Sequence, residues 1–267
     1  MGLLVFVGLG LHDEKGLTLR GLELARRADA VFLELYTNPM PNLRLEQLRR
    51  LVGRPIKLVS RKMMEEEEGK QILKEAEKGL TVLLVPGDPF IATTHIDLRI
   101  RAEKMGIKTS VVHGPSIISA AISLSGLQNY RFGRTVTIPY PEMESYPETP
   151  LRVILENRGR DLHTLCLLDV KAEERRYMTV RDTLEVLLRA EEKAKVGAVG
   201  LNTLVVAVAS AGSPNPIVRA GSVGEIMGED LGQPPHTLIF PASLHFMEAE
   251  ALITLAGAPE WVRGWLK

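Results

Sequence analysis

The stretch Leu3-Leu4-Val5-Phe6-Val7-Gly8-Leu9-Gly10 decides the fold. Its five leading apolar residues predict a buried strand, and its two glycines allow a tight turn where that strand ends. Apolar runs and amphipathic stretches then alternate, which is typical of βαβ units and a parallel sheet. The predicted strands cover residues 3–7, 30–35, 56–59, 81–85 and 108–112, and the predicted helices cover 18–28, 45–52, 65–78 and 93–105.

The second half of the chain is less regular. Its predicted strands cover residues 135–138, 162–168, 203–209 and 238–240, its predicted helices cover 116–124, 180–188 and 248–255, and residues 140–150 form a proline-rich loop. Gly53 and Gly257 are expected to end the helices that precede them. The change in pattern after the fifth strand predicts two α/β domains, residues 1–113 and residues 114–267.

Composition excludes several classes of protein. The 267 residues are 45% hydrophobic and 25% charged, which is ordinary for a globular chain. With 33 basic and 33 acidic side chains the net charge is zero, so we expect no dedicated nucleic-acid binder. The single cysteine, Cys166, rules out an internal disulfide and thiolate zinc sites. We expect no signal peptide and no membrane span, and hence a cytoplasmic protein.

Three turns rich in Gly, Pro and Ser follow the first, fourth and fifth strands: Gly8–Gly10, Pro86–Pro89 and His113–Ser116. Because parallel strands end at one edge of a sheet, these turns predict a small-molecule site there. Each also has a plainer interpretation: a tight turn at the first, a helix cap from Asp88 at the second, and an N-cap from Ser116 at the third. Asp13 stands where a dinucleotide fingerprint needs its third glycine.

Other catalytic patterns are missing from the sequence. None of the six histidines falls in an HxxxH or HExxH pattern, so we expect no metal site. There is no GxSxG motif of the kind that serves acyl transfer. The acidic run Glu65–Glu68 is expected to be the solvated start of a helix.

At this point the motifs resemble those of the tetrapyrrole methylase superfamily. Val5–Gly10, Leu17–Gly21, Ala28–Val31, Pro86–Pro89 and the strand Val205–Ala209 with Ala211-Gly212 carry the likeness. This resemblance implies two α/β domains, with a mostly parallel sheet in the N-terminal one and a mixed sheet in the C-terminal one. It also implies an S-adenosylmethionine cofactor in a cleft between the domains.

Within that superfamily the chain most resembles the archaeal diphthine synthase family. The continuation Ala92-Thr93-Thr94-His95, the stretch Leu168–Glu173, Pro234-Pro235-His236 and Ala256–Pro259 carry this second likeness. The resemblance implies cofactor contacts from Leu11, Asp88, Ile91, Ser116, Ile117, Leu168, Ala209 and His236.

The same resemblance implies a reaction. The enzyme is expected to place three methyl groups on the amine of a 3-amino-3-carboxypropyl group, which is attached to a histidine of translation elongation factor 2. It implies a homodimer, elongation factor 2 as protein partner and no metal. His95, His113 and Asp169 are conceivable bases, and no catalytic residue is assigned.

Two alternatives remain open. A corrin or porphyrin C-methyltransferase shares the superfamily motifs but lacks the subfamily stretches. A non-catalytic nucleotide-binding module needs only the three turns and binds without turnover.

Overall fold

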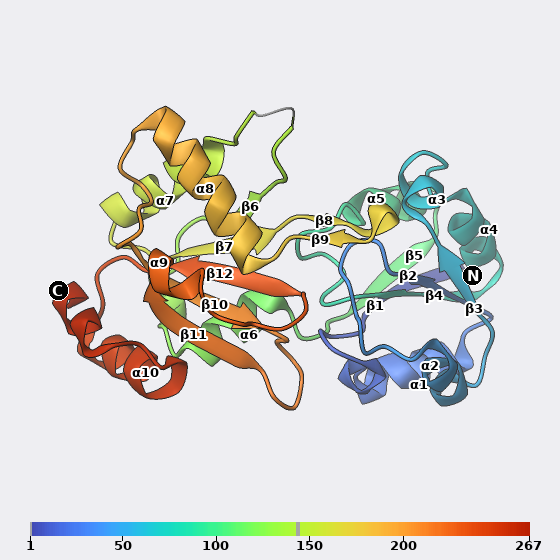
Figure 1. Cartoon of the computed structure of the whole chain (residues 1–267). Coiled ribbons are helices and arrows are strands. Elements are labelled where there is room, and N and C mark those ends of the chain that lie inside the picture. Colours follow the sequence, from blue (N-terminus) through green and yellow to red (C-terminus); the bar gives the residue numbers. More distant parts are fainter. Residues whose placement is uncertain (1, 143–144) are drawn as a thin grey trace. The chain divides into compact units, whose positions relative to one another are not determined.

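The computed structural model describes residues 2–142 and 145–267, and it divides into two compact units. Unit 1 holds residues 1–117 and 171–175, and unit 2 holds residues 118–170 and 176–267. Figure 1 labels their helices and strands. The predicted division after residue 113 and the predicted cofactor cleft stay predictions.

Unit 1 is a parallel sheet between two layers of helices. Its strands run in the order β3-β2-β4-β1-β5, and every pair is parallel. They are β1 (Leu3–Gly8), β2 (Ala30–Glu34), β3 (Ile56–Val59), β4 (Leu80–Val85) and β5 (Lys108–Val112). The helices are α1 (Leu19–Arg27), α2 (Leu45–Val52), α3 (Arg61–Glu65), α4 (Lys70–Lys78) and α5 (Ile96–Lys104), with a 3-10 turn, η1, at Glu14–Gly16.

The two faces of this sheet bury separate cores because neighbouring strand residues point to opposite sides. Val5 and Val7 of β1 pack with the layer of α1 and α2, whereas Leu4 and Phe6 pack with the layer of α4 and α5. In Figure 1 the helices of the two layers cover opposite faces of the blue-to-green sheet. The βαβ prediction for this half is confirmed.

Unit 2 is built on a mixed sheet, in the order β11-β10-β12-β7-β6. Only β6 and β7 run parallel, and the other three pairs are antiparallel. The strands are β6 (Val136–Ile138), β7 (Thr164–Leu168), β10 (Leu204–Ala209), β11 (Ile217–Ser222) and β12 (His236–Phe240). A separate ribbon pairs β8 (Val170–Lys171) with β9 (Arg176–Tyr177).

The helices of unit 2 are α7 (Thr149–Gly159), α8 (Val180–Ala194), α9 (Val223–Ile226) and α10 (Phe246–Ala256), and α6 (Ile117–Ser125) leads into it. Short 3-10 turns of unit 2 are η2 (Asn129–Arg131) and η4 (Glu260–Trp265), whereas η3 (Ala172–Glu174), between β8 and β9, belongs to unit 1. Side chains of α7 and α8 pack on one sheet face around Cys166, Ala207 and Leu238. The predicted mixed sheet in this half is confirmed.

Three predictions of secondary structure are wrong. The helix predicted over 65–78 begins only at Lys70, because α3 ends at Glu65 and the left-handed φ angles of Glu68 (+58°) and Gly69 (+63°) interrupt the chain before α4. Glu65 is therefore the last residue of α3, and the acidic run is not a helix start. The helix expected from residue 93 begins at Ile96, because Thr93 Oγ1 donates to Pro89 O in a turn (2.6 Å).

The elements that escaped prediction in the second half of the chain include α7 and β11. Helix α7 starts inside the expected proline-rich loop, with Pro150 in its first turn, where a missing N–H costs nothing. Residues 143 and 144 of that loop lie outside the described residues. Strand β11 is at the sheet edge, and its Arg219 and two small residues hide the strand pattern. As expected, Gly53 and Gly257 end α2 and α10 with left-handed φ angles.

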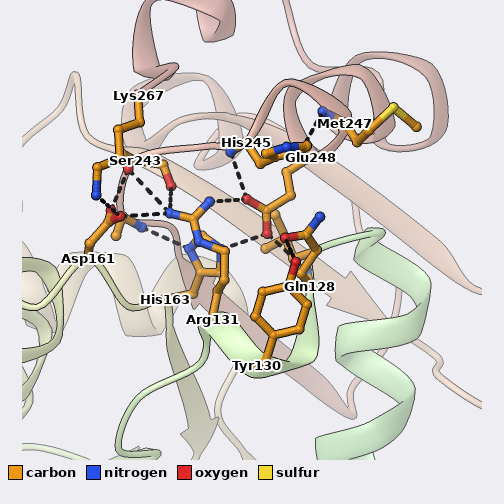
Figure 2. Close-up of polar contacts among 12 residues, drawn as sticks. Gln128, Tyr130, Arg131, Asp161, His163, Ser243, His245, Met247, Glu248 and Lys267 are labelled. Carbon is orange, nitrogen blue, oxygen red and sulfur yellow. Dashed lines mark hydrogen bonds and ion pairs between the residues drawn. The ribbon is translucent and has the colours of Figure 1, made fainter.

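A buried polar network fixes α10 to the sheet of unit 2 (Figure 2). The Glu248 carboxylate accepts from His163 Nε2 (3.0 Å), Arg131 Nη1 (2.5 Å) and the Gln128 N–H (2.9 Å). Arg131 also pairs with Asp161, which binds Lys267 near the end of the chain. Burial alone raises the pKa of Glu248, but hydrogen bonds, led by that from His163, outweigh burial and lower the pKa to about 2.

Glu248→Gln is expected to lower the free energy of unfolding by about 3 kcal/mol at pH 7. A carboxyl whose pKa is depressed in the folded state stabilises fully above its unfolded pKa and loses this contribution as pH falls toward 2. The wild type should therefore lose more stability than the variant between pH 5 and pH 2, measured by urea denaturation. Glu250→Gln is the control, because its ion pair with Arg263 is exposed and is worth less than about 1 kcal/mol. Equal losses in the two variants would contradict the role of Glu248.

Candidate functional site

Strands β1 and β4 are joined beyond their ends by a pair of backbone hydrogen bonds. Gly10 N–H donates to Gly87 O (3.2 Å), and Gly87 N–H donates to Gly10 O (2.7 Å). Leu9 N–H continues the ladder to Val85 O (2.8 Å). Both glycines have left-handed φ angles, +76° and +68°. The first and second turns are therefore one structural piece.

The third turn packs against the same piece. A Cβ on Gly8 would lie 2.5 Å from both Gly114 N and Gly87 O, and a Cβ on Gly114 would collide with Gly87 O. No side chain fits at either position. The prediction that the three turns meet at the carboxyl edge of the sheet is confirmed.

Asp88 is held rigidly at this edge. Its side chain is buried, and its Oδ1 accepts the Phe90 N–H (3.1 Å). Its Oδ2 lies 2.7 Å from Nδ1 of His113, whose side chain is 77% exposed. Asp88 thus ties the second turn to the third, and it caps its own turn rather than a helix.

The remaining predicted residues of unit 1 surround these turns. Leu11 is buried, and its Cδ2 would be 3.9 Å from a Cβ on Gly87. Ile91 is exposed in the loop after Asp88, and its N–H donates to Asp88 O (3.3 Å). Ser116 directly precedes α6, in the N-cap position, and Ile117 is the first residue of that helix.

The three predicted residues of unit 2 lie at one end of three adjacent strands. Ala209 pairs with His236 across β10 and β12. Leu168 follows Leu167, which pairs with Thr237 across β12 and β7. The structure therefore brings Leu168, His236 and Ala209 together within unit 2, and it places Leu11, Asp88, Ile91, Ser116 and Ile117 in or directly after the three turns of unit 1.

His236 has a buried donor without a partner. The Val180 N–H donates to its Nδ1 (3.3 Å), so the ring proton lies on Nε2. Nε2 is buried and has no hydrogen-bond partner among the described residues. Burial lowers the pKa of His236, which keeps the ring neutral. Within unit 2, this free donor fits a polar group of a ligand.

Sequence reasoning missed a polar cluster at the end of β2. Glu34, the last residue of that strand, is fully buried and lies 3.3 Å from Nε2 of His95. Tyr36, two residues further on, is buried as well. The signal was a glutamate inside an otherwise apolar strand, because an acid buried there requires partners.

The other two conceivable bases have evident partners. His113 is paired with Asp88, as described above. Asp169 Oδ2 accepts the Tyr140 N–H (3.0 Å), which is a structural contact in unit 2. Among the described residues no group of three or more His, Cys, Asp or Glu side chains is placed to hold a metal ion.

Comparisons with known proteins agree with this geometry. A profile of the Tetrapyrrole (Corrin/Porphyrin) Methylases matches residues 3–227. A diphthine synthase of Methanocella arvoryzae is 47% identical over 255 residues, which cover 96% of this chain and 98% of that protein. One of Methanothermobacter thermautotrophicus is 44% identical over 97% and 98% of the two chains. A crystal structure of a diphthine synthase superposes with a TM-score of 0.88 at 36% identity, covering 99% and 100% of the chains.

The chain thus belongs to the tetrapyrrole methylase family, which uses S-adenosylmethionine as methyl donor. Its relatives match over nearly their full length and are diphthine synthases. Within the family it belongs with them, as a methyltransferase of diphthamide biosynthesis. No helix in the described part of the chain is both long and apolar enough to span a membrane.

Proposed function

We propose that this chain trimethylates the amine of a 3-amino-3-carboxypropyl group on a histidine of translation elongation factor 2. The observation that carries the proposal is the full-length similarity to diphthine synthases, at 42–47% identity over 94–97% of the chain. Such similarity covers the stretches outside the general methylase motifs, including residues 92–95 and 168–173. The cytoplasm, where elongation factor 2 works, is the proposed location.

We also propose that Leu11, Asp88, Ile91, Ser116, Ile117, Leu168, Ala209 and His236 contact the cofactor. The glycine edge of unit 1, which is the closely packed turns at Gly8, Gly10 and Gly87, supports this, because it holds Asp88 and Leu11 at the carboxyl end of the sheet. Apolar Leu11 and Ile91 suit an adenine ring or a methionine chain. His236 Nε2 supplies a donor that lacks a protein partner.

The reaction needs little acid–base catalysis by side chains of the protein. When bound, S-adenosylmethionine supplies a sulfonium methyl group that is already activated for transfer. A neutral amine forms the new C–N bond as the S–C bond breaks, and S-adenosylhomocysteine leaves. The main task of the side chains is to align the amine with that methyl group, which can lower the barrier by several kcal/mol. The nitrogen loses one proton in each of the three rounds.

Asp88→Ala is expected to weaken S-adenosylmethionine binding about tenfold or more, because the turn loses its bonds to Phe90 and His113. Isothermal calorimetry measures the dissociation constant. Asp29→Ala is a matched control, since Asp29 also binds a backbone N–H, that of Leu80, but at the opposite end of the sheet. An Asp88→Ala protein with wild-type affinity would remove Asp88 from the cofactor site.

The methyl acceptor is tested directly. Labelled S-adenosylmethionine is incubated with the enzyme and elongation factor 2 carrying the unmethylated 3-amino-3-carboxypropyl histidine, and separately with a uroporphyrinogen-type acceptor. We expect label in the factor, and mass spectrometry should show a gain of three methyl groups. Label in the tetrapyrrole alone would favour a C-methyltransferase, and cofactor binding without transfer to either acceptor would favour a non-catalytic module.

We propose a homodimer formed through α10. Most residues of this helix are apolar, and Phe246, Met247 and Leu255 expose 54–62% of their surface. Ala251 of the same helix contacts Gly126, next to the equally apolar α6. Exposed apolar surface of this kind is typical of protein interfaces.

Sedimentation velocity should show a dimer for the wild type and a monomer for Leu255→Glu, because the charge would be buried in the interface. Leu201→Glu is the control, since Leu201 is equally exposed but lies outside α6 and α10. A monomeric wild type would refute the proposal, and so would a dimer that survives Leu255→Glu.

A further inference from the structure

The polar cluster at the end of β2 is buried but incompletely paired. The Glu34 carboxylate accepts from the N–H groups of Tyr36 (3.0 Å) and Thr37 (3.1 Å) and from the Thr37 hydroxyl (2.5 Å). His95 Nε2 adds a fourth contact at 3.3 Å. Because a carboxylate can only accept, Nε2 carries the ring proton, and Nδ1 is left with a lone pair.

Two polar atoms of this cluster have no partner. His95 Nδ1 and the Tyr36 hydroxyl are both buried without a hydrogen bond among the described residues. The two rings are neighbours, with centroids 6.1 Å apart. The Thr94 hydroxyl is beside the phenol and donates to Glu65 (3.3 Å), but its geometry relative to the Tyr36 hydroxyl falls short of a hydrogen bond. A buried polar atom without a partner costs folding free energy, and two of them on neighbouring rings together point to a ligand.

An acidic and a basic group lie near the Tyr36 phenol. Burial, and then the nearby Glu34 carboxylate, raise the pKa of Tyr36, so its hydroxyl keeps its proton and can donate. The Arg61 guanidinium lies over the Tyr36 ring, 5.5 Å from its centre. Arg61 forms no ion pair with any carboxylate that the structure describes.

The cluster lies beside the proposed cofactor edge. Strand β2 is the neighbour of β4, and Leu33 pairs with Leu84, just before the Asp88 turn. The glycine edge lies on the other side of β4, where β1 ends. With strands about 4.8 Å apart, a group bound at the cluster would be within reach of a methyl donor at that edge.

We propose that His95, Tyr36 and Arg61 form a subsite for an α-amino acid group. His95 Nδ1 accepts a hydrogen bond from the ammonium group, while the Tyr36 hydroxyl and Arg61 bind the carboxylate. The 3-amino-3-carboxypropyl acceptor ends in such a group, and in identifying it as the ligand this inference rests on the proposed function. Glu34 acts as a positioning residue, since it orients His95 and fixes its tautomer.

Entry to this subsite requires a movement of the adjacent loop. Tyr36 and His95 are only 6% and 1% exposed. Residues 90–94 run from the Asp88 turn to His95, and Ala92 among them has a left-handed φ of +56°, which is rare for alanine. A shift of this loop on ligand binding would open the phenol and the imidazole together.

Tyr36→Phe separates a ligand-binding role from a structural one. The change removes a hydroxyl that has no partner, so we expect an unchanged or higher melting temperature and unchanged affinity for S-adenosylmethionine. The KM for elongation factor 2 carrying the 3-amino-3-carboxypropyl histidine should rise about tenfold or more, measured by transfer of labelled methyl groups. His95→Gln, which keeps a donor for Glu34 but removes the Nδ1 acceptor, should raise the same KM.

Thr81→Val is the matched control. Thr81 has a buried hydroxyl without a partner in the same sheet, but at the opposite end of β4 from the Asp88 turn. It should leave the KM for the factor unchanged. A wild-type KM in Tyr36→Phe would overturn the subsite, and so would an equal rise in Thr81→Val.

A second measurement is independent of the elongation factor. NMR signals of the His95 and Tyr36 rings should shift on titration with L-2-aminobutyrate, which carries the complete α-amino acid group, and not with butyrate or butylamine. Shifts without methyl transfer to the factor would refute the proposed function but retain the subsite. Transfer to the factor without these shifts would refute the subsite alone.

Discussion

The reciprocal pair of hydrogen bonds between Gly10 and Gly87 is the contact on which the functional edge depends. This antiparallel bridge follows the parallel pairing of β1 and β4. It therefore joins the turn after β1 to the turn after β4, beyond the ends of both strands. Gly8 and Gly114 close the arrangement, because a side chain at either position would meet backbone. These contacts fix the backbone at Asp88, and the two oxygens of its carboxylate link the second turn to the third.

The strands of unit 1 are predicted well from the sequence because the apolar runs and the glycines indicate the same strand boundaries. Buried parallel strands are continuous apolar runs, and glycines mark their ends. The errors arise where short-range contacts compete with periodicity. Thr93 favours a turn through its hydroxyl, and Gly69 permits a left-handed bend inside a helical pattern. In unit 2, β11 has a charged residue and small residues at a sheet edge, so its pairing comes from β10 rather than from its own pattern.

The candidate site was predictable to a similar degree. Motif spacing places Asp88 and the glycines because strand ends are visible in the sequence. Family resemblance was needed for Leu168, Ala209 and His236, whose alignment depends on the register of three distant strands. Glu34 and Tyr36 were missed because their significance lies in a contact with His95, 61 residues after Glu34.

Two buried histidine–glutamate pairs in this chain differ in whether the second ring nitrogen of the histidine has a hydrogen-bond partner. His163 donates to Glu248 through Nε2 and accepts the Ala242 N–H at Nδ1 (3.0 Å), so both ring nitrogens are paired. Such a ring anchors a helix and has nothing left to offer a ligand. His95 makes the same contact with Glu34, yet its Nδ1 remains unpaired beside an unpaired phenol. Both histidines are buried, but only His163 has partners at both ring nitrogens. We therefore regard the pair of His163 and Glu248 as structural and the pair of His95 and Glu34 as part of a ligand site.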